Sequence, residues 1–543
     1  MFQINIFSRK DLTMAPQPNY WDVLAFLFIA AIIFAIVWLG NQMVEPFSVG
    51  EPITISLDPS VLPLYCLRSV SRIFISLIFS LLFTFIIGAA AAKSKFAEKI
   101  IIPFIDILQS VPVLGFLSVS IWGFLVLFPN SLLGPECAAI FAIFTAQVWN
   151  MILSFYQSLL MVPKSLNEAS RVLMLSPWQR FWSVDVPFAM PSLLWNMMLS
   201  ISASWFFMVA SEAIEVGNNT ILLPGIGSYI AVAIKNANIS AVISAVIAMF
   251  ITIFLYDQIF FRPIMSWGSK FRTSSIGDDY NSNIILKFLH RTKLARFIFR
   301  SITRLFKFII ALLGSIVTIN FSSNEKGLMQ KFSLFFTRAI KVCVFFIILL
   351  SILQLILFVH TKISVDELHH VIYLGALTSA RVLIMILVCL ILWVPIGVTI
   401  GLRSNIASKA QPIIQMLAAF PANLFFPLFV SFVIKYNLNI DIWLSPLMIL
   451  GTQWYILFNV IAGALQLPHE QRYAIKLFAT KKILCWRRFI LPGILPHLVT
   501  GMMTAAGGAW NASILAEAVN WGNSELYARG LGAYITYLSL IHI

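Results

Sequence analysis

Long, continuous apolar stretches separated by short polar segments dominate the pattern along the chain. Val23 to Gly40 and Val342 to Val359 are two examples, and neither alternates between apolar and polar positions. Continuous runs predict membrane-spanning helices, because the strands of a transmembrane barrel alternate and because lipid leaves every backbone amide to be satisfied internally. We therefore expect an all-α polytopic membrane protein.

A helix needs roughly 20 mostly apolar residues to cross a bilayer. By that criterion the sequence predicts about eleven spans, at residues 22–40, 70–92, 101–128, 137–161, 191–213, 241–261, 340–359, 374–401, 411–434, 442–465 and 496–519. The first run begins near Tyr20 and lacks the small-residue cleavage site of a signal peptide, so we interpret it as a retained span.

Composition excludes a soluble globular protein. Of the 543 residues, 60% are hydrophobic and only 11% are charged. A soluble fold of this size could not bury so much apolar surface. The five cysteines show no spacing typical of a metal site, and we predict no metal site and no catalytic residue.

Basic residues orient the spans, because Lys and Arg resist translocation. With the N-terminus placed in the cytoplasm, thirty of the 37 Lys and Arg residues fall in cytoplasmic segments and four in outer ones. The C-terminus is then predicted outside. This bias, together with anionic lipid, accounts for the net charge of +15 without nucleic acid as a partner.

The segment 262–338 is the longest stretch without a predicted span. Basic residues recur in it at three- to five-residue intervals between Lys287 and Lys307, with apolar residues between them. This pattern predicts a basic amphipathic helix lying on the cytoplasmic leaflet. We interpret 262–338 as a cytoplasmic linker between two larger units.

Those two units are copies of each other. An offset of 309 residues pairs Arg72, Gly88, Pro103 and Pro112 with Arg381, Gly397, Pro412 and Pro421. An offset of 305 then pairs Trp149, Pro163, Ala169, Pro187, Pro191, Trp205, Glu212, Gly225, Gly227 and Tyr229 with Trp454, Pro468, Ala474, Pro492, Pro496, Trp510, Glu517, Gly530, Gly532 and Tyr534. Self-similarity at a fixed offset through several residue types indicates an internal repeat.

The repeats set the domain organisation. The first repeat covers 1–261, with its core at 70–261, and the second covers 339–543 without a counterpart of the span 241–261. Six spans precede the second copy, so the copies run parallel and enclose an interface on a pseudo-two-fold axis, a natural place for a pathway.

A cytoplasmic segment with helical apolar spacing lies between the fourth and fifth spans of each repeat. One begins at Pro163 and the other at Pro468. Such a loop alone is often a solvated turn. Two equal elements at matched places, however, suit docking of a two-fold symmetric partner.

These segments resemble the EAA loop of ABC-importer permeases, in which Glu-Ala-Ala is followed by a Gly, an aliphatic residue and a Pro. The matching residues are Glu168, Ala169, Ser170, Met174, Val184 and Pro187 in the first copy, and Tyr473, Ala474, Ile475, Ala479, Phe489 and Pro492 in the second. The Glu is present only in the first copy and the Gly in neither. The stretches SWFFMVASEAI and AWNASILAEAV, then PGIGSYI and RGLGAYI, look like the nitrate, sulfonate and taurine branch of these permeases.

The resemblance covers about 70–240 and 375–540 and implies two tandem type I ABC-importer permease folds in one bacterial inner-membrane chain. It implies a transport component, not an enzyme, that moves a small anionic solute such as nitrate, sulfonate, taurine or bicarbonate. The chain has no GxxxxGK[ST] phosphate loop. ATP and Mg²⁺ would therefore bind two separate ATPase subunits docked on the EAA-type loops, and an external binding protein would deliver the solute.

Three matched pairs are candidates for the pathway or its gate. Arg72 and Arg381 are either attractive to an anion or snorkelling to the outer headgroups. Glu212 and Glu517 are either gating residues or interfacial residues that pack on the next loop, and we favour the second reading. Trp205 and Trp510 lie on the same helix faces as the glutamates and are either pathway-lining or packing residues.

Two other functions stay open. A secondary transporter with parallel repeats would need ionisable residues at mid-bilayer, and the spans contain almost none. A truncated or non-transporting membrane scaffold is the other alternative, because the second repeat lacks a counterpart of the last span.

Overall fold

The computed structural model of the protein describes most of the chain. The described residues are 38, 40–47, 53–111, 113–216, 219–268, 364–467, 482–521 and 524–541, with eight helical positions between 346 and 361. Most of them lie in helices, and two short hairpins are the only sheets among them. The predicted helical membrane class is confirmed.

The described part of the first repeat contains four long apolar spans, with short helices between them and one hairpin between the third and the fourth. In order its elements are η2 (Pro59–Val61), α2 (Leu62–Phe83), η3 (Thr84–Gly88), α3 (Ala89–Lys93), α4 (Lys95–Ser110), α5 (Val113–Leu127), α6 (Leu133–Leu160), α7 (Lys164–Val172), α8 (Pro177–Arg180), η4 (Phe181–Asp185), α9 (Val186–Glu212), β1 (Ala213–Val216), β2 (Asn219–Leu222), α10 (Ile226–Lys235), α11 (Ile239–Tyr256), η5 (Asp257–Phe261) and α12 (Arg262–Gly268).

The described part of the second repeat follows the same order as far as α24, the counterpart of α10. Its described elements are α16 (Val365–Gly401), α17 (Ser404–Ala419), η8 (Ala422–Phe425), α18 (Phe426–Lys435), α19 (Ile440–Trp443), α20 (Leu447–Gln466), α22 (Lys482–Cys485), η9 (Trp486–Ile490), α23 (Leu491–Glu517), β3 (Ala518–Trp521), β4 (Ser524–Tyr527) and α24 (Leu531–Ile541). The hairpins have the same register, with Ala213 opposite Leu222 and Ala518 opposite Tyr527.

Six described helices are long and apolar enough to cross a bilayer, and two bent pairs raise the number to eight if each pair is one span. The six are Pro59–Lys93, Leu133–Leu160, Pro177–Glu212, Ile239–Met265, Val365–Gly401 and Ile483–Glu517. The count of eleven is therefore not confirmed. Most residues of the predicted spans 22–40 and 340–359 lie outside the described residues. Residues 269–338 of the linker, including the predicted amphipathic helix, lie wholly outside them.

The predicted continuous span at 101–128 was wrong. The segment consists of two helices, α4 and α5, because the chain leaves the helical conformation at Val111, where φ is −75° and ψ is 124°. Val111 precedes Pro112, and a residue before proline is pushed from the helical to the extended region. Phe420, which precedes Pro421, has φ −71° and ψ 124°. The same break therefore occurs in both repeats, and the predicted span at 411–434 is likewise not one continuous helix, because its two parts are bent by 74°.

Matched glycines let the first long helix of each repeat approach its neighbour closely. A Cβ on Gly88 would lie 2.8 Å from a ring carbon of Phe155 in α6, and one on Gly397 would lie 2.8 Å from Val460 in α20. Small residues at helix contacts are the usual device in membranes, where association depends on van der Waals packing. The pairing of Gly88 with Gly397 thus reflects the same helix contact made twice.

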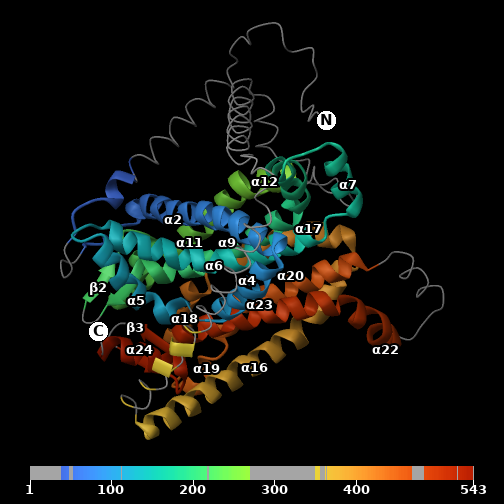
Figure 1. The fold of residues 1–543 in the computed structure, drawn as a ribbon. Coiled ribbons are helices and arrows are strands. Elements are labelled where there is room, and N and C mark those ends of the chain that lie inside the picture. The colour runs from blue at the N-terminus through green and yellow to red at the C-terminus, as the bar shows by residue number, and fades with distance from the viewer. Residues whose placement is uncertain are drawn as a thin grey trace, which may run out of the picture.

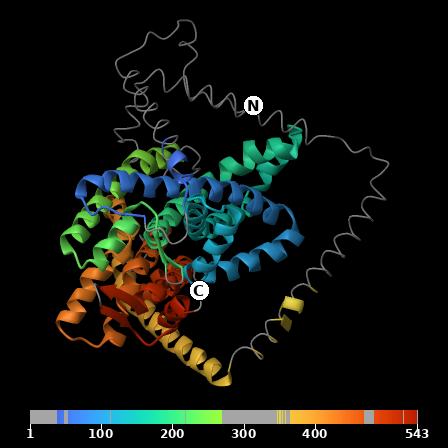
Figure 2. The same ribbon diagram turned by 90° about the vertical axis from the view of Figure 1, so that its left-hand side faces the viewer.

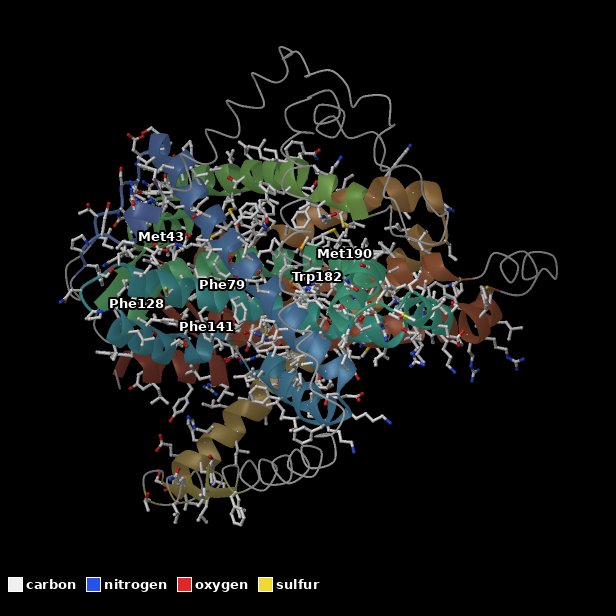
Figure 3. The ribbon with its side chains drawn as sticks, turned by 45° about the horizontal axis from the view of Figure 1, so that its top comes forward. Met43, Phe79, Phe128, Phe141, Trp182 and Met190 are labelled. Atoms are coloured by element: carbon white, nitrogen blue, oxygen red, sulfur yellow. The ribbon has the colours of Figure 1, made fainter. Side chains whose placement is uncertain are left out.

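The two repeats lie against each other over their length. In Figure 1 most of the first repeat lies above most of the second, and Figure 2 shows the same division from the side. Both hairpins lie at one end of the long helices, called the hairpin end below, and α7 and α22 lie at the opposite end, called the α7 end (Figure 1). In Figure 3, Met43 and Phe128 lie toward the hairpin end, and Trp182 and Met190 toward the α7 end.

Contacts between the repeats cross over in a matched way. The backbone N–H of Val113, which follows the break between α4 and α5, donates to Oδ1 of Asn511 in α23 at 2.8 Å. Conversely, Nδ2 of Asn423, which follows the break before η8, donates to the carbonyl of Phe206 in α9 at 3.3 Å. The break in each repeat therefore contacts the fifth-span helix of the other, as a pseudo-two-fold arrangement requires.

Candidate functional site

A fully buried ionic cluster lies at the hairpin end of the first repeat. Nε and Nη2 of Arg72 in α2 each donate at 2.6 Å to the two carboxylate oxygens of Glu136 in α6. Nη1 of Arg72 donates to Oε1 of Glu212 in α9 at 2.5 Å. The side chains of Arg72 and Glu212 are 0% exposed and that of Glu136 is 2% exposed. A bidentate guanidinium–carboxylate pair is the arrangement that best offsets the cost of removing both charges from water.

Glu212 also holds the loop that follows the hairpin. Its Oε2 accepts a hydrogen bond from the backbone N–H of Gly227 at 2.6 Å, and its Oε1 accepts one from the hydroxyl of Ser69 at 2.5 Å. The Ser69 hydroxyl in turn accepts from the N–H of Ile226 at 3.1 Å. A Cβ on Gly225 would collide with the carboxylate of Glu212. The glycines are therefore needed for close approach, and the cluster fixes the start of α10 against α2 and α9.

The second repeat carries the same cluster in a more exposed form. Arg381 contacts Glu517 through Nη1 at 2.9 Å and Asp441 through Nη2 at 3.1 Å. Glu517 accepts from the hydroxyl of Thr378 at 2.8 Å and from the N–H of Gly532 at 2.7 Å. Glu517 is 1% exposed, but the side chain of Arg381 is 14% exposed and that of Asp441 is 39% exposed.

The structure thus brings together four of the six candidate pathway residues, as two Arg–Glu pairs. Arg72 and Arg381 each have their positive charge met by two carboxylates of the protein. Chemically, each cluster can tie helix ends and the hairpin loop together. The pathway and gating roles of these residues stay predictions.

Trp205 lies in a packed core, and Trp510 packs against one. Trp205 is 1% exposed and makes an edge-to-face contact with Tyr256 of α11, with the ring centroids 5.5 Å apart. Trp510 is half-buried and packs against the apolar cluster that includes Ala509 and Ala516. Both positions give the side chains extensive apolar contacts, which is how aromatic residues most often stabilise a fold.

Sequence reasoning missed two pairs of residues in these clusters. The third charged member is Glu136 in the first repeat and Asp441 in the second, and the hydroxyl donor is Ser69 in the first and Thr378 in the second. A signal was present, because the offset of 305 pairs Glu136 with Asp441 and the offset of 309 pairs Ser69 with Thr378. Both pairs conserve chemistry but not identity, and a search for identical residues passes over them.

A second candidate site is the EAA-like segment of the first repeat, which forms the short helix α7 at the α7 end. Glu168 and Ala169 are exposed, and Ser170 is the only buried residue of the helix, at 2% exposure. The neighbouring side chains of Leu166, Val172 and Leu173 are 38%, 80% and 58% exposed. A helix that turns this much apolar surface outward, away from the long spans, is typical of an interaction surface.

The backbone conformation of Met174 shows why the EAA motif has glycine at this position. It follows the helix in the left-handed conformation, with φ of 49°. Its N–H donates to the carbonyl of Arg171, and the N–H of Leu175 donates to that of Ser170. This is the Schellman pattern, whose left-handed residue is usually glycine because a Cβ is unfavourable there. Met174 keeps the turn, and its side chain is 91% exposed.

The EAA-like segment of the second repeat is only partly described. Tyr473, Ala474 and Ala479 lie outside the described residues, and description resumes at Lys482. Pro187 and Pro492 lie near the starts of α9 and α23, each after a π-helical turn, η4 and η9. Proline has no N–H for the preceding turn to bond, so a widened turn at this place accommodates it in both repeats.

A comparison with protein families decides the identity of the fold. The family model described as "binding-protein-dependent transport system inner membrane component" matches residues 83–261 and 393–537, one match in each repeat. The two matches together cover more than half of the chain. The chain belongs to this family. Its members are inner-membrane permeases, and the resemblance inferred from the EAA-like loops is confirmed, as is the duplication.

Individual relatives are named as permease proteins for nitrate, bicarbonate or taurine. The nitrate import permease protein NrtB of Synechocystis is 29% identical over 157 residues, which is 29% of this chain and 52% of the relative. The bicarbonate transport system permease protein CmpB of Synechococcus elongatus is 29% identical over 106 residues, 20% of this chain and 36% of the relative. The taurine transport system permease protein TauC of Escherichia coli is 25% identical over 158 residues, 29% of this chain and 54% of the relative. The chain therefore spans about half the length of the curated relatives it matches.

Proposed function

We propose that this chain is the transmembrane permease component of an ABC importer that moves a small anionic solute into the cytoplasm. The membership of both repeats in the permease family supports the transport role. The names of the relatives support a solute with an anionic group, since nitrate and bicarbonate are anions and taurine carries a sulfonate. The chain would supply the pathway, whereas ATP and Mg²⁺ would bind separate ATPase subunits and an external protein would deliver the solute.

The observation that carries this proposal is the apolar tip of α7, formed by Val172, Leu173 and Met174. All three side chains are more than half exposed. With the N-terminus in the cytoplasm, the α7 end faces the cytoplasm, so lipid does not cover this tip. An exposed apolar surface on a projecting helix fits a groove on a partner protein. The ATPase subunit is the partner that an importer needs on this side, and the segment 468–481 would serve a second copy.

Docking is tested by placing charges on the tip. The full chain, affinity-tagged in its native host, is purified from membranes and assayed for Mg²⁺-dependent ATP hydrolysis. We expect the wild type to carry ATPase activity, and the double variant Leu173→Glu/Met174→Glu to lose nearly all of it because a buried unpaired charge opposes docking. Val44→Glu is the matched control, since Val44 is 59% exposed and directly follows Met43, which lies toward the opposite, hairpin end (Figure 3). ATPase activity that persists in the tip variant would contradict the docking assignment.

The solute class is tested with the same preparation in proteoliposomes. Uptake of labelled nitrate, bicarbonate and taurine is measured with ATP inside the compartment that holds the ATPase, and with the binding protein supplied outside. We expect ATP-dependent uptake of one of these anions, which an uncharged solute of similar size does not compete away. Uptake driven by an ion gradient without ATP would favour a secondary transporter instead.

A further inference from the structure

A chain of polar contacts connects α7 to the transmembrane helices of the first repeat. Oδ1 of Asn167 in α7 accepts a hydrogen bond from Nη2 of Arg180 at 2.6 Å. Nε of Arg180 lies 3.6 Å from Oδ1 of Asp185, and Nζ of Lys93 lies 3.1 Å from its Oδ2. Lys93 ends α3 and Asp185 directly precedes α9. The path therefore runs from α7 to the ends of two long helices.

Asp185 is the central member of this chain. Its side chain is only 4% exposed, whereas those of Arg180 and Lys93 are 34% and 45% exposed. A buried carboxylate needs partners of opposite charge, and Asp185 has one on each side. Lys93 is held further by the ring of Phe181, with Nζ 4.9 Å from the ring centroid. If Asp185 is replaced by a neutral residue, the partly exposed side chains of Lys93 and Arg180 can be solvated by water. The substitution therefore leaves no unpaired charge buried in the protein.

Among the residues that the structure describes, α7 has few other contacts that would hold it in place. Ser170 is the only buried residue in the helix, and it donates a hydrogen bond within the helix, to the carbonyl of Asn167. A helix with so few buried apolar contacts derives its position from its ends and its polar contacts. The contact between Asn167 and Arg180 is therefore a principal restraint on the body of α7.

The second repeat has none of this chemistry at the matched described positions. The offsets place Leu402 opposite Lys93, Cys485 opposite Arg180 and Ile490 opposite Asp185. Ile490 is buried in an apolar cluster of the second repeat, and Leu402 and Cys485 pack against that cluster. The same junction is thus ionic in the first repeat and apolar in the second.

We propose that Asp185 is a positioning residue that transmits movement of α7 to α3 and α9, and that the two repeats are coupled to their ATPase subunits by different means. The proposal rests on the proposed function, since movement of α7 is useful only if a partner drives it. In the first repeat the link is the ionic chain through Arg180. In the second repeat the matched described positions, Leu402, Cys485 and Ile490, form an apolar junction, which is insensitive to charge substitution.

The first test needs no ATPase. Amide hydrogen exchange of α7 is measured in the purified full chain for the wild type, for Asp185→Asn and for Glu98→Gln. Glu98 is the matched control, a part-buried carboxylate that accepts from the hydroxyl of Tyr156 on the same side of the protein. We expect exchange in 164–172 to rise about fivefold in Asp185→Asn and to stay unchanged in Glu98→Gln. Unchanged exchange in Asp185→Asn overturns the proposal, whatever the partner.

A double-mutant cycle tests whether Asp185 acts on α7 through Arg180 or only stabilises the protein in general. Arg180→Gln breaks the link to α7 directly. Because both substitutions interrupt one path, we expect the exchange of α7 in Asp185→Asn/Arg180→Gln to match that of either single variant. Independent effects that add up would mean that the two residues do not act in one chain, and would overturn the proposal.

The second test measures coupling in the complex purified with its ATPase. For Asp185→Asn we expect ATP hydrolysis to persist while solute uptake per ATP hydrolysed falls several-fold, with no such fall for Glu98→Gln. An unchanged ratio overturns the transmission role. If wild-type chain carries no ATPase at all, the proposed function fails, whereas the exchange experiment still decides whether Asp185 positions α7.

Discussion

The two ionic clusters at the hairpin end share a design but not an environment. Arg72 is sealed from solvent between Glu136 and Glu212, whereas Arg381 shares a partly exposed site with Asp441 and Glu517. A charge pair in a dry site depends on each of its members, because water cannot replace one that is lost. A partly exposed site tolerates the loss of one charged member better, because solvent can replace part of the lost contact. The same geometry therefore occurs twice, and we expect it to contribute more to stability in the first repeat than in the second.

Removing the arginines should give the largest difference between the repeats. Arg72→Met leaves two buried carboxylates without a counter-charge and should destabilise the protein by about 3–5 kcal/mol. Arg381→Met leaves Glu517 buried but Asp441 in contact with water, so we expect about 1–3 kcal/mol. Thermal unfolding of the two variants in lipid nanodiscs measures the difference. Equal shifts of the midpoint would show that burial does not distinguish the clusters.

Substituting the glycines beside the glutamates tests what the clusters have in common. A Cβ at Gly225 or Gly530 would overlap the carboxylate of Glu212 or Glu517, displacing it from its arginine and from the loop N–H. Gly225→Ala and Gly530→Ala should each cost about 2–3 kcal/mol, with nearly the same midpoint shift in both repeats. A matched control is Gly375→Ala, where a Cβ meets nothing within 4 Å.

Neutralising the third charge separates the clusters on a smaller scale. Glu136→Gln weakens a buried bidentate contact and should cost about 1.5–3 kcal/mol. Asp441→Asn affects a side chain that is 39% exposed, and a pair in that setting is worth about 0.5–1 kcal/mol. The same nanodisc measurement applies. A larger shift for Asp441→Asn than for Glu136→Gln would reverse the ranking.

The smallest effect is expected at the rim of the second cluster. Arg529 lies 4.0 Å from Asp441 and its side chain is 78% exposed, whereas its backbone N–H donates to Asp441 at 2.7 Å. Arg529→Ala keeps that N–H, so we expect the free energy of unfolding to change by less than about 0.5 kcal/mol. The thermal unfolding midpoint in nanodiscs should then hardly move. A clear loss of stability would mean that the second cluster is drier in the bilayer than its exposure indicates.

The sequence predicts the repeat, the helical class and the family well, because each rests on many residues. Breaks within the apolar runs are harder to predict. Hydropathy is high on both sides of Val111, and only the proline that follows it indicates that α4 and α5 are separate helices. Averaging over a window removes that signal, although the same proline in the second repeat could have restored it.

The ionic clusters could be predicted only in part. Arg72 and Glu212 are recognisable as charges in apolar surroundings, but nothing local in the sequence shows that they contact each other. A lone charge in a span is costly, and this cost by itself predicts that opposite charges near one membrane level will pair. Glu136 lies one residue before a predicted span, where it resembles an ordinary solvated carboxylate. Its partner is 64 residues away on another helix, and only the fold brings the two together.

The crossed contacts between the repeats bear on how such a protein can evolve. On one side a helix contributes the side chain of Asn511 and the opposing turn contributes the backbone of Val113. On the other side the turn contributes the side chain of Asn423 and the helix contributes the backbone of Phe206. A dimer of identical subunits would present every substitution twice, once at each contact. When both copies are joined in one polypeptide, a substitution changes only one of the two contacts and leaves the other intact. The two contacts can therefore diverge in sequence.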